Sequence, residues 1–166
     1  PAAPTTMNAP IHREIPASAL LDTGRALAGI SAQWDGDIVR RLTDYIAIPA
    51  KSPSFDPDWV AHGHIETVVR QAADWVLAQN VPGLQLEIVR LQKPDGSPRT
   101  PVLFFEIAGT KPGSDQTALM YGHLDKQPEF NGWRNDLGPW TPKYEDGRLY
   151  GRGGADDGYA VYAAIA

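Results

Sequence analysis

The chain has 166 residues, of which 42% are hydrophobic, and a formal net charge of −5, with 20 Asp and Glu against 15 Lys and Arg. This length and apolar content suffice for one modest core, and the acidic balance without a basic stripe argues against nucleic acid or an anionic membrane as a partner. The sequence has no cysteine, which excludes disulfides and thiolate ligands, and its apolar runs are far too short to span a bilayer.

The first part of the chain predicts an extension followed by two helices. Residues 1–16 are rich in Pro, Ala and Thr without an apolar period, which is typical of a mobile terminus. Helical spacing follows from Ser18 to Ile30, and Asp37 is expected to open a second helix that ends before Pro49. Because no initiator Met precedes Pro1, a mature end left by a signal peptide and an arbitrary boundary both stay open, and with them a cytoplasmic or an exported location.

The middle of the chain predicts a helix and three strands. Residues 50–57 form a loop by their prolines. Residues 58 to about 80 are the clearest helix, because apolar residues recur at positions 65, 68, 69, 72, 73, 76 and 77. Residues 84–91 and 102–107 are predicted strands on either side of a turn at 93–98. Residues 117–122 are expected to be a third, buried strand, whose carboxyl end is where open α/β sheets bind ligands.

An imidazole and several carboxylates follow this third strand. His123 and Asp125 are two residues apart, so on an extended backbone their side chains share one face. One ring nitrogen could then bind a metal while Asp125 accepts a hydrogen bond from the other. Asp156 and Asp157 lie in residues 151–158, where four of eight residues are glycine. Two adjacent carboxylates favour a cation, and zinc accepts His nitrogen together with carboxylate oxygen.

Each motif also has an ordinary structural alternative. A His-x-Asp sequence can be an ion pair at a strand end, and Asp-Asp can cap a following helix. His62 and His64 look like a chelating pair, but two residues apart on a helix their rings diverge by about 200°, which favours exposed rings that bind no metal. The glycine run at 151–154 lacks the P-loop lysine and precedes two acids, which disfavours phosphate.

Three runs of the sequence together resemble a known family: Tyr121–Pro128, Trp133–Pro142 and Asp146–Asp157. They are similar to the co-catalytic zinc peptidases and deacylases, which include carnosinase-like dipeptidases, aminoacylase, bacterial glutamate carboxypeptidase, acetylornithine deacetylase and succinyl-diaminopimelate desuccinylase. The resemblance starts at about Asp37 and concerns the N-terminal part of such enzymes. It implies an α/β fold with a mixed sheet flanked by helices, in which residues 1–36 are an extension and helix and residues 37–166 an incomplete catalytic domain.

The resemblance also implies roles for single residues. His123 would ligate one of two zinc ions, Asp156 would bridge both, and Asp125 would be the catalytic-site carboxylate that orients His123. The peptide bond between Asp156 and Asp157 is expected to be cis. Cobalt or manganese could substitute for zinc, and the implied substrate is a short peptide or an N-acyl amino acid.

Two departures from the family pattern matter. Dipeptidase-like members usually have Lys after the Asp pair, where this chain has Gly158, so the substrate subgroup stays open. The adjacent Glu pair that supplies the general base and a ligand in the family is absent from residues 1–166. The base and the remaining ligands are therefore expected in a missing C-terminal part of the same protein, whether or not it is a separate chain.

The sequence thus predicts metal-assisted hydrolysis of a peptide or amide bond, with this segment supplying part of a two-zinc site and inactive alone. A homodimer is left open as well. Two alternatives remain: a non-catalytic fragment or interaction module that keeps a remnant metal motif, and a single-metal binding protein without hydrolysis. The chain ends in a predicted helix whose apolar face, Val161 to Ile165, favours the truncated enzyme over the interaction module.

Overall fold

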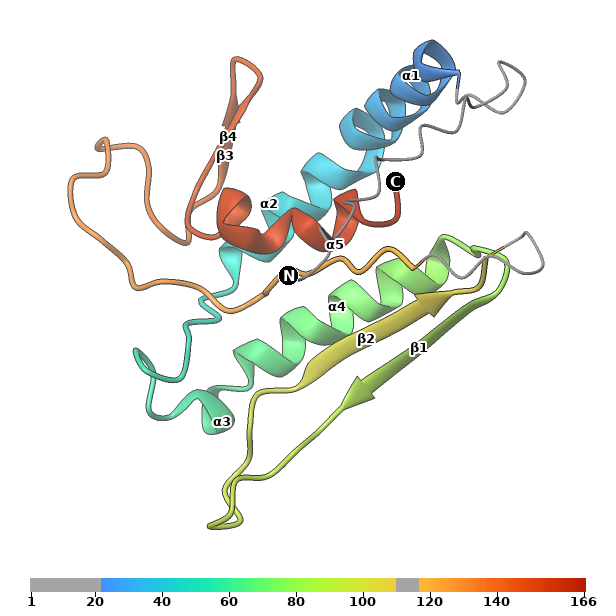
Figure 1. Cartoon of the computed structure of the whole chain (residues 1–166). Helices are drawn as coiled ribbons and strands as arrows, with labels where there is room; N and C mark the ends of the chain where they lie inside the picture. Colours follow the sequence, from blue (N-terminus) through green and yellow to red (C-terminus); the bar gives the residue numbers. More distant parts are fainter. Residues whose placement is uncertain (1–21, 110–116) are drawn as a thin grey trace, which may run out of the picture.

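The computed structural model describes residues 22–109 and 117–166. Figure 1 shows a helical rod, a long helix against a β-hairpin, a smaller hairpin and a short C-terminal helix. The elements are α1 (Thr23–Gln33), the π-helical turn η2 (Trp34–Ile38), α2 (Val39–Ala47), α3 (Trp59–His62), α4 (His64–Ala78), β1 (Leu84–Val89), β2 (Val102–Ile107), β3 (Lys143–Glu145), β4 (Arg148–Tyr150), the turn η3 (Gly154–Gly158) and α5 (Ala160–Ala163). Within these two ranges, no helix is both long and apolar enough to cross a membrane.

The N-terminal helices form one continuous rod from α1 through η2 to α2. The rod begins after Asp22, whose side chain accepts a hydrogen bond from the backbone N–H of Arg25 at 3.0 Å; the predicted start at Ser18 lies outside the described residues. The expectation that Asp37 opens a second helix is wrong, because no break precedes it. Its carboxylate instead accepts a 2.7 Å hydrogen bond from the indole N–H of Trp75 in α4, and this bond lowers the pKa of the Asp37 carboxyl below its ordinary value.

The predicted helix at residues 58–80 is two helices. Gly63 has φ +67° and separates α3 from α4, because a glycine takes this left-handed conformation without a steric penalty. The apolar stripe of α4 is buried as predicted, except that Leu77 is half exposed and Trp75 is buried in addition. The core joins this stripe to α2 and α5; its buried members are Ile38, Leu42, Tyr45, Ile46, Ala50, Ile65, Val68, Val69, Trp75, Val76 and Tyr162.

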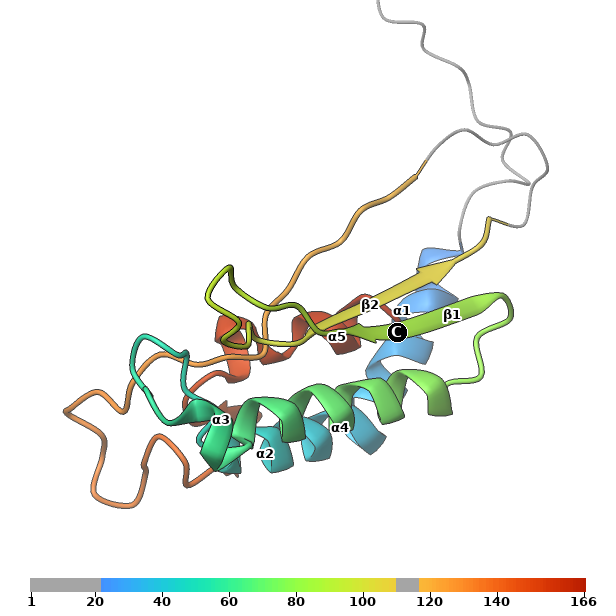
Figure 2. The ribbon, with the colours of Figure 1, turned by 90° about the horizontal axis from the view of Figure 1, so that it is seen from below.

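The predicted hairpin is confirmed. β1 and β2 pair antiparallel, in a register from Leu84 opposite Ile107 to Val89 opposite Val102. In the turn, the backbone N–H of Lys93 donates to Ser97, and that of Gly96 donates to Lys93. Figure 2 shows the hairpin lying along α4. Alternate residues of the two strands pack against the core below them, and the intervening ones face away from it, as the period of two requires.

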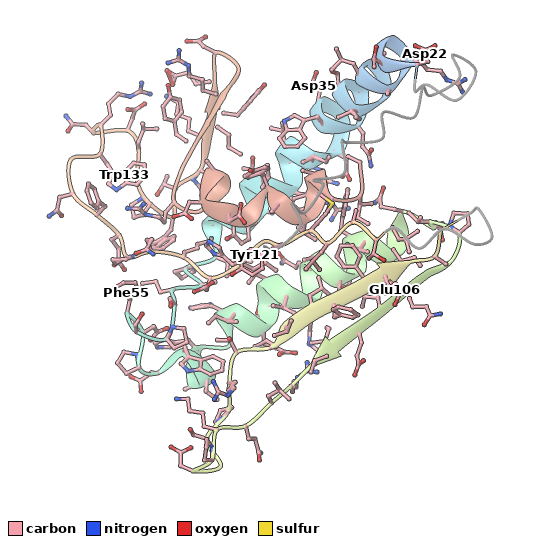
Figure 3. The ribbon with its side chains drawn as sticks, in the orientation of Figure 1. Asp22, Asp35, Phe55, Glu106, Tyr121 and Trp133 are labelled. Carbon is pink, nitrogen blue, oxygen red and sulfur yellow. The ribbon has the colours of Figure 1, made fainter. Side chains whose placement is uncertain are left out.

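The predicted third strand is wrong. Residues 117–122 have no strand partner among the described residues, and Leu119, Met120 and Tyr121 are exposed. A strand needs a neighbour for its backbone N–H and C=O groups, and apolar composition alone does not supply one. Figure 3 labels Tyr121 on this extended segment.

A second, three-residue hairpin of β3 and β4 was not expected. Asp146 and Gly147 form its turn with φ values of 50° and 73°, so the Asp-Gly pair, a strong hairpin signal, could have predicted it. The described residues therefore hold two antiparallel ladders and a parallel bridge between Lys51 and Lys126. Helices pack beside them, which confirms the α/β class.

Candidate metal centre

Two segments that are distant in sequence meet beside α2 to form the candidate site. The first segment contains His123, and the residues that directly follow His123 are bonded to α2 and to the loop after α2. The hydroxyl of Tyr45 donates to the carbonyl of Leu124 at 3.0 Å. The backbone of Lys126 donates to Ala50 and accepts from Ser52, each at 2.9 Å. These bonds fix the chain on the C-terminal side of His123, although residues 117–122 are unpaired.

The second segment is the glycine-rich turn that carries Asp156 and Asp157. Gly158 packs so closely on Tyr45 that an added Cβ would lie 2.2 Å from the ring atom Cε1. Gly122, which precedes His123, packs equally closely on α5, the helix that follows the turn. An added Cβ at Gly122 would lie 2.5 Å from Cβ of Ala160. Missing side chains at these two glycines therefore let the two segments contact α2 and each other.

The imidazole of His123 lies against Asp125. Its Nδ1 lies 3.0 Å from the backbone carbonyl oxygen of Asp125 and 3.3 Å from the carboxylate oxygen Oδ1. Both oxygens are acceptors, so this side of the ring favours a proton on Nδ1. A neutral ring with that proton would present the lone pair of Nε2 on its other side, which is the form that binds metals.

Nε2 of His123 faces the carboxylate of Asp156, with 3.2 Å between Nε2 and Oδ1. Two donor atoms that each lie about 2.0–2.1 Å from a tetrahedral zinc ion are about 3.3–3.4 Å apart. The observed spacing therefore fits two ligands of one ion. The Asp156 side chain is 60% exposed and the His123 side chain 33%, which leaves the pair accessible from solvent.

Asp157 points in a different direction from Asp156. Its Oδ2 accepts a 3.3 Å hydrogen bond from the backbone N–H of His123, so this carboxylate binds the main chain rather than the ring. The peptide bond between the two aspartates is cis, as the family resemblance implied. Of the adjacent pair, Asp156 is the one whose carboxylate faces the His123 ring.

In residues 22–109 and 117–166, the candidate site included, no group of three or more His, Cys, Asp and Glu side chains is arranged to hold a metal ion. The structure brings together His123, Asp125 and Asp156, the three residues chosen from the sequence.

The histidine pair in the middle of the chain differs from expectation. His62 and His64 lie on either side of the Gly63 break, and their rings stack with 5.7 Å between centroids and 28° between planes. The expected divergence of the rings is wrong because the helix is interrupted between them. Nδ1 of His62 lies 2.8 Å from Oδ2 of the buried Asp56, and this hydrogen bond lowers the pKa of the Asp56 carboxyl.

Lys126 is the residue near the site that sequence reasoning missed. It is 1% exposed, although lysine is almost never fully buried. Burial lowers the pKa of its ammonium to about 7, while three backbone carbonyls within 2.6 to 3.3 Å of Nζ favour the charged form. No local pattern could have indicated this, because the carbonyls belong to residues about 80 positions earlier.

Comparisons with known proteins agree with the family resemblance. Residues 119–166 match the model of peptidase family M20/M25/M40. The chain is 33% identical over 133 residues to the Beta-Ala-His dipeptidase of Mus musculus, covering 78% of this chain and 26% of that protein. It is 29% identical over 126 residues to the Cys-Gly metallodipeptidase DUG1 of Candida albicans, covering 72% of this chain and 24% of that protein.

The fold of the chain is also similar to that of a solved structure. The crystal structure of human carnosine dipeptidase 1 superposes with a TM-score of 0.58 at 26% identity, covering 86% of this chain and 29% of that one. The chain belongs to peptidase family M20/M25/M40, and it is similar to the N-terminal part of these enzymes, as the motifs predicted. It spans about a quarter of the length of the relatives it matches. Membership in a family with metallodipeptidases implies a metal cofactor.

Proposed function

We propose that this chain supplies part of the metal centre of a peptidase that hydrolyses a peptide or amide bond in a short peptide or an N-acyl amino acid. His123 and Asp156 would hold the metal, which we take to be zinc, and Asp125 would orient the imidazole. The observation that carries the proposal is the 3.2 Å separation between Nε2 of His123 and Oδ1 of Asp156. The other ring nitrogen, Nδ1, lies 3.0 Å from the backbone carbonyl oxygen of Asp125. In the complete two-zinc site Asp156 would bridge both ions.

The chemistry that such a metal supplies when bound is Lewis acidity, which polarises the scissile carbonyl and activates water. The residues of this chain contribute position and charge. Asp125 keeps the proton on Nδ1, so that Nε2 stays available. The carboxylate of Asp157 accepts a hydrogen bond from the backbone N–H of His123. This bond holds the main chain there and keeps the imidazole beside Asp156.

The proton transfers of hydrolysis need a general base, which we expect outside residues 1–166. We therefore propose that residues 1–166 alone bind metal weakly and do not turn over substrate. The printed names of the relatives suggest β-alanyl-histidine and cysteinyl-glycine as the first dipeptides to assay, with an N-acyl amino acid beside them. These assays need the complete protein.

Titration of the chain with Co²⁺ tests the metal centre directly. Paramagnetic shifts of the histidine side-chain NMR signals should be largest for His123, and they should disappear in His123→Ala and weaken in Asp156→Asn. His64→Ala is the matched control, because it removes an imidazole away from the centre and should leave the titration unchanged. A direct ion pair between a protonated His123 and Asp156 gives the same 3.2 Å spacing; if Co²⁺ causes no shift at His123, that alternative holds and the metal proposal fails.

A further inference from the structure

The ammonium of Lys126 is buried among backbone carbonyl groups at the end of α2. Nζ donates to the carbonyl oxygens of Tyr45 and Ile48 at 2.6 Å and of Ile46 at 3.3 Å. A lysine has three N–H donors, so all three can be used. The carbonyl of Tyr45 also accepts from the backbone N–H of Ile48, and that of Ile48 accepts from Ala50. The carboxyl end of a helix is the negative end of its dipole, which favours a cation at this position.

The rest of the side chain is enclosed by aromatic rings and by the glycine-rich turn. Nζ lies 3.9 Å from the centroid of the Tyr45 ring and 5.3 Å from that of Trp140, within the range of cation–π attraction. On another side the aliphatic stem lies against Gly153, where an added Cβ would be 2.8 Å from Cγ and 3.0 Å from Cδ and Cε. The Lys126 side chain is thus packed between α2 and the segment that leads to Asp156.

Lys126 also belongs, through its main chain, to the segment that carries His123. Its backbone pairs with Ala50 and Ser52, and it directly follows Asp125. One residue therefore contacts all three parts that set the site: the end of α2, the His123 segment and the turn before Asp156. On the other side of His123, residues 117–122 have no strand partner among the described residues, and Gly122 is held there by its packing on Ala160.

We propose that Lys126 is a positioning residue, which sets the separation between His123 and Asp156 by holding their two segments against the end of α2. The inference rests on the proposed function, because it concerns the same metal pair. Without this side chain, the carbonyl oxygens of Tyr45, Ile46 and Ile48 lose the ammonium as a donor, and the glycine turn loses the stem it packs on. The two ligand segments are then free to separate.

The first experiment exploits the absence of cysteine from the chain. Lys126→Cys is alkylated with 2-bromoethylamine in denaturant, which restores an ammonium on a side chain of lysine length, and the protein is refolded. Co²⁺ affinity at His123 should fall at least tenfold in Lys126→Cys and Lys126→Met, and should return to within threefold of wild type after aminoethylation. Unchanged affinity in Lys126→Met, or an aminoethylated protein that refolds without recovering affinity, overturns the inference.

A matched pair of glycine variants keeps the test decisive if removal of the ammonium prevents folding. Gly153→Ala and Gly147→Ala both place a methyl at positive φ, +90° and +73°, but only Gly153 touches Lys126, and nothing lies within 4 Å at Gly147. Gly153→Ala should lower Co²⁺ affinity at His123 and Gly147→Ala should not. Equal effects of the two variants refute the positioning role.

The failure of this inference can be told apart from failure of the proposed function. If wild type binds no Co²⁺ at His123, the metal centre fails, and the metal-free side-chain ¹⁵N shifts of His123 are compared instead. A change of the His123 tautomer signal in Gly153→Ala, with none in Gly147→Ala, then supports positioning by Lys126. Identical His123 signals in both variants overturn it.

Discussion

Replacement of Gly158 by alanine tests whether the glycine turn is held against α2 by close packing. The added methyl would lie 2.2, 2.7 and 2.8 Å from three atoms of the Tyr45 ring, whereas carbon atoms in contact are about 3.5–4.0 Å apart. At least one group must therefore shift by more than about 1 Å. The φ angle of Gly158 is not positive, so the expected effect is steric and not conformational.

Tyr45 is poorly able to make room. Its side chain is 3% exposed, its hydroxyl is bonded to Leu124, and the ammonium of Lys126 lies over its ring. Overpacking of a core typically costs about 1–3 kcal/mol, and we expect the upper end of that range. For a chain of this size, about 3 kcal/mol corresponds to a melting temperature lower by about 6–12 °C.

Urea denaturation followed by tryptophan fluorescence measures this loss. Gly29→Ala is the control, because it makes the same change in α1 where nothing lies within 4 Å, and it should stabilise the protein by about 0.5–1 kcal/mol. In a double-mutant cycle, the smaller side chain of Tyr45→Leu should relieve much of the cost of Gly158→Ala. A Gly158→Ala protein within about 0.5 kcal/mol of wild type refutes the packing argument.

Three further predictions concern the scaffold. Trp75→Phe removes the hydrogen bond to the Asp37 carboxylate and should lower the unfolding free energy in urea by about 1.5–3 kcal/mol; no change would mean that solvent replaces the bond. Hydrogen bonds from Trp75 and His62 lower the pKa values of the Asp37 and Asp56 carboxyls. Each ionised carboxylate therefore stabilises the folded protein above the ordinary carboxyl pKa, and this stabilisation is lost as the pH falls through the lowered pKa. Urea midpoints should therefore decline between about pH 4 and pH 2, less steeply in Asp56→Asn, and equal slopes would contradict this. Gly63→Ala meets no atom within 4 Å but has φ +67°, so it should cost about 1–2 kcal/mol from backbone strain alone, which the same denaturation measures.

Local sequence patterns were sufficient for the elements whose partners lie nearby in the chain. The apolar stripe of α4 and the hairpin of β1 and β2 follow from periods of 3.6 and 2 residues. Residue type and spacing pointed to His123, Asp125 and the Asp156–Asp157 pair, and the family resemblance selected Asp156 from that pair. The structure brings the side chains of His123, Asp125 and Asp156 together. Their roles at a metal remain predictions until the titration is done.

Only the tertiary structure decided the features that depend on distant residues. Residues 117–122 have the composition of a buried strand but no strand beside them among the described residues, and strand pairing is a property of two segments. Spacing alone does not distinguish Asp156 from Asp157, and the structure places one carboxylate beside the ring and the other on the main chain.

Lys126 is the clearest case of this division between sequence and structure. Its neighbours in sequence are polar, and a lone lysine is expected at the surface. Its burial depends on three carbonyls at the end of α2, up to 81 positions away, and on the space left by Gly153. The sequence determined which chemical groups are available, and the packing of distant segments determined which of them meet, because the cost of burying a charge is offset only by partners that folding brings to it.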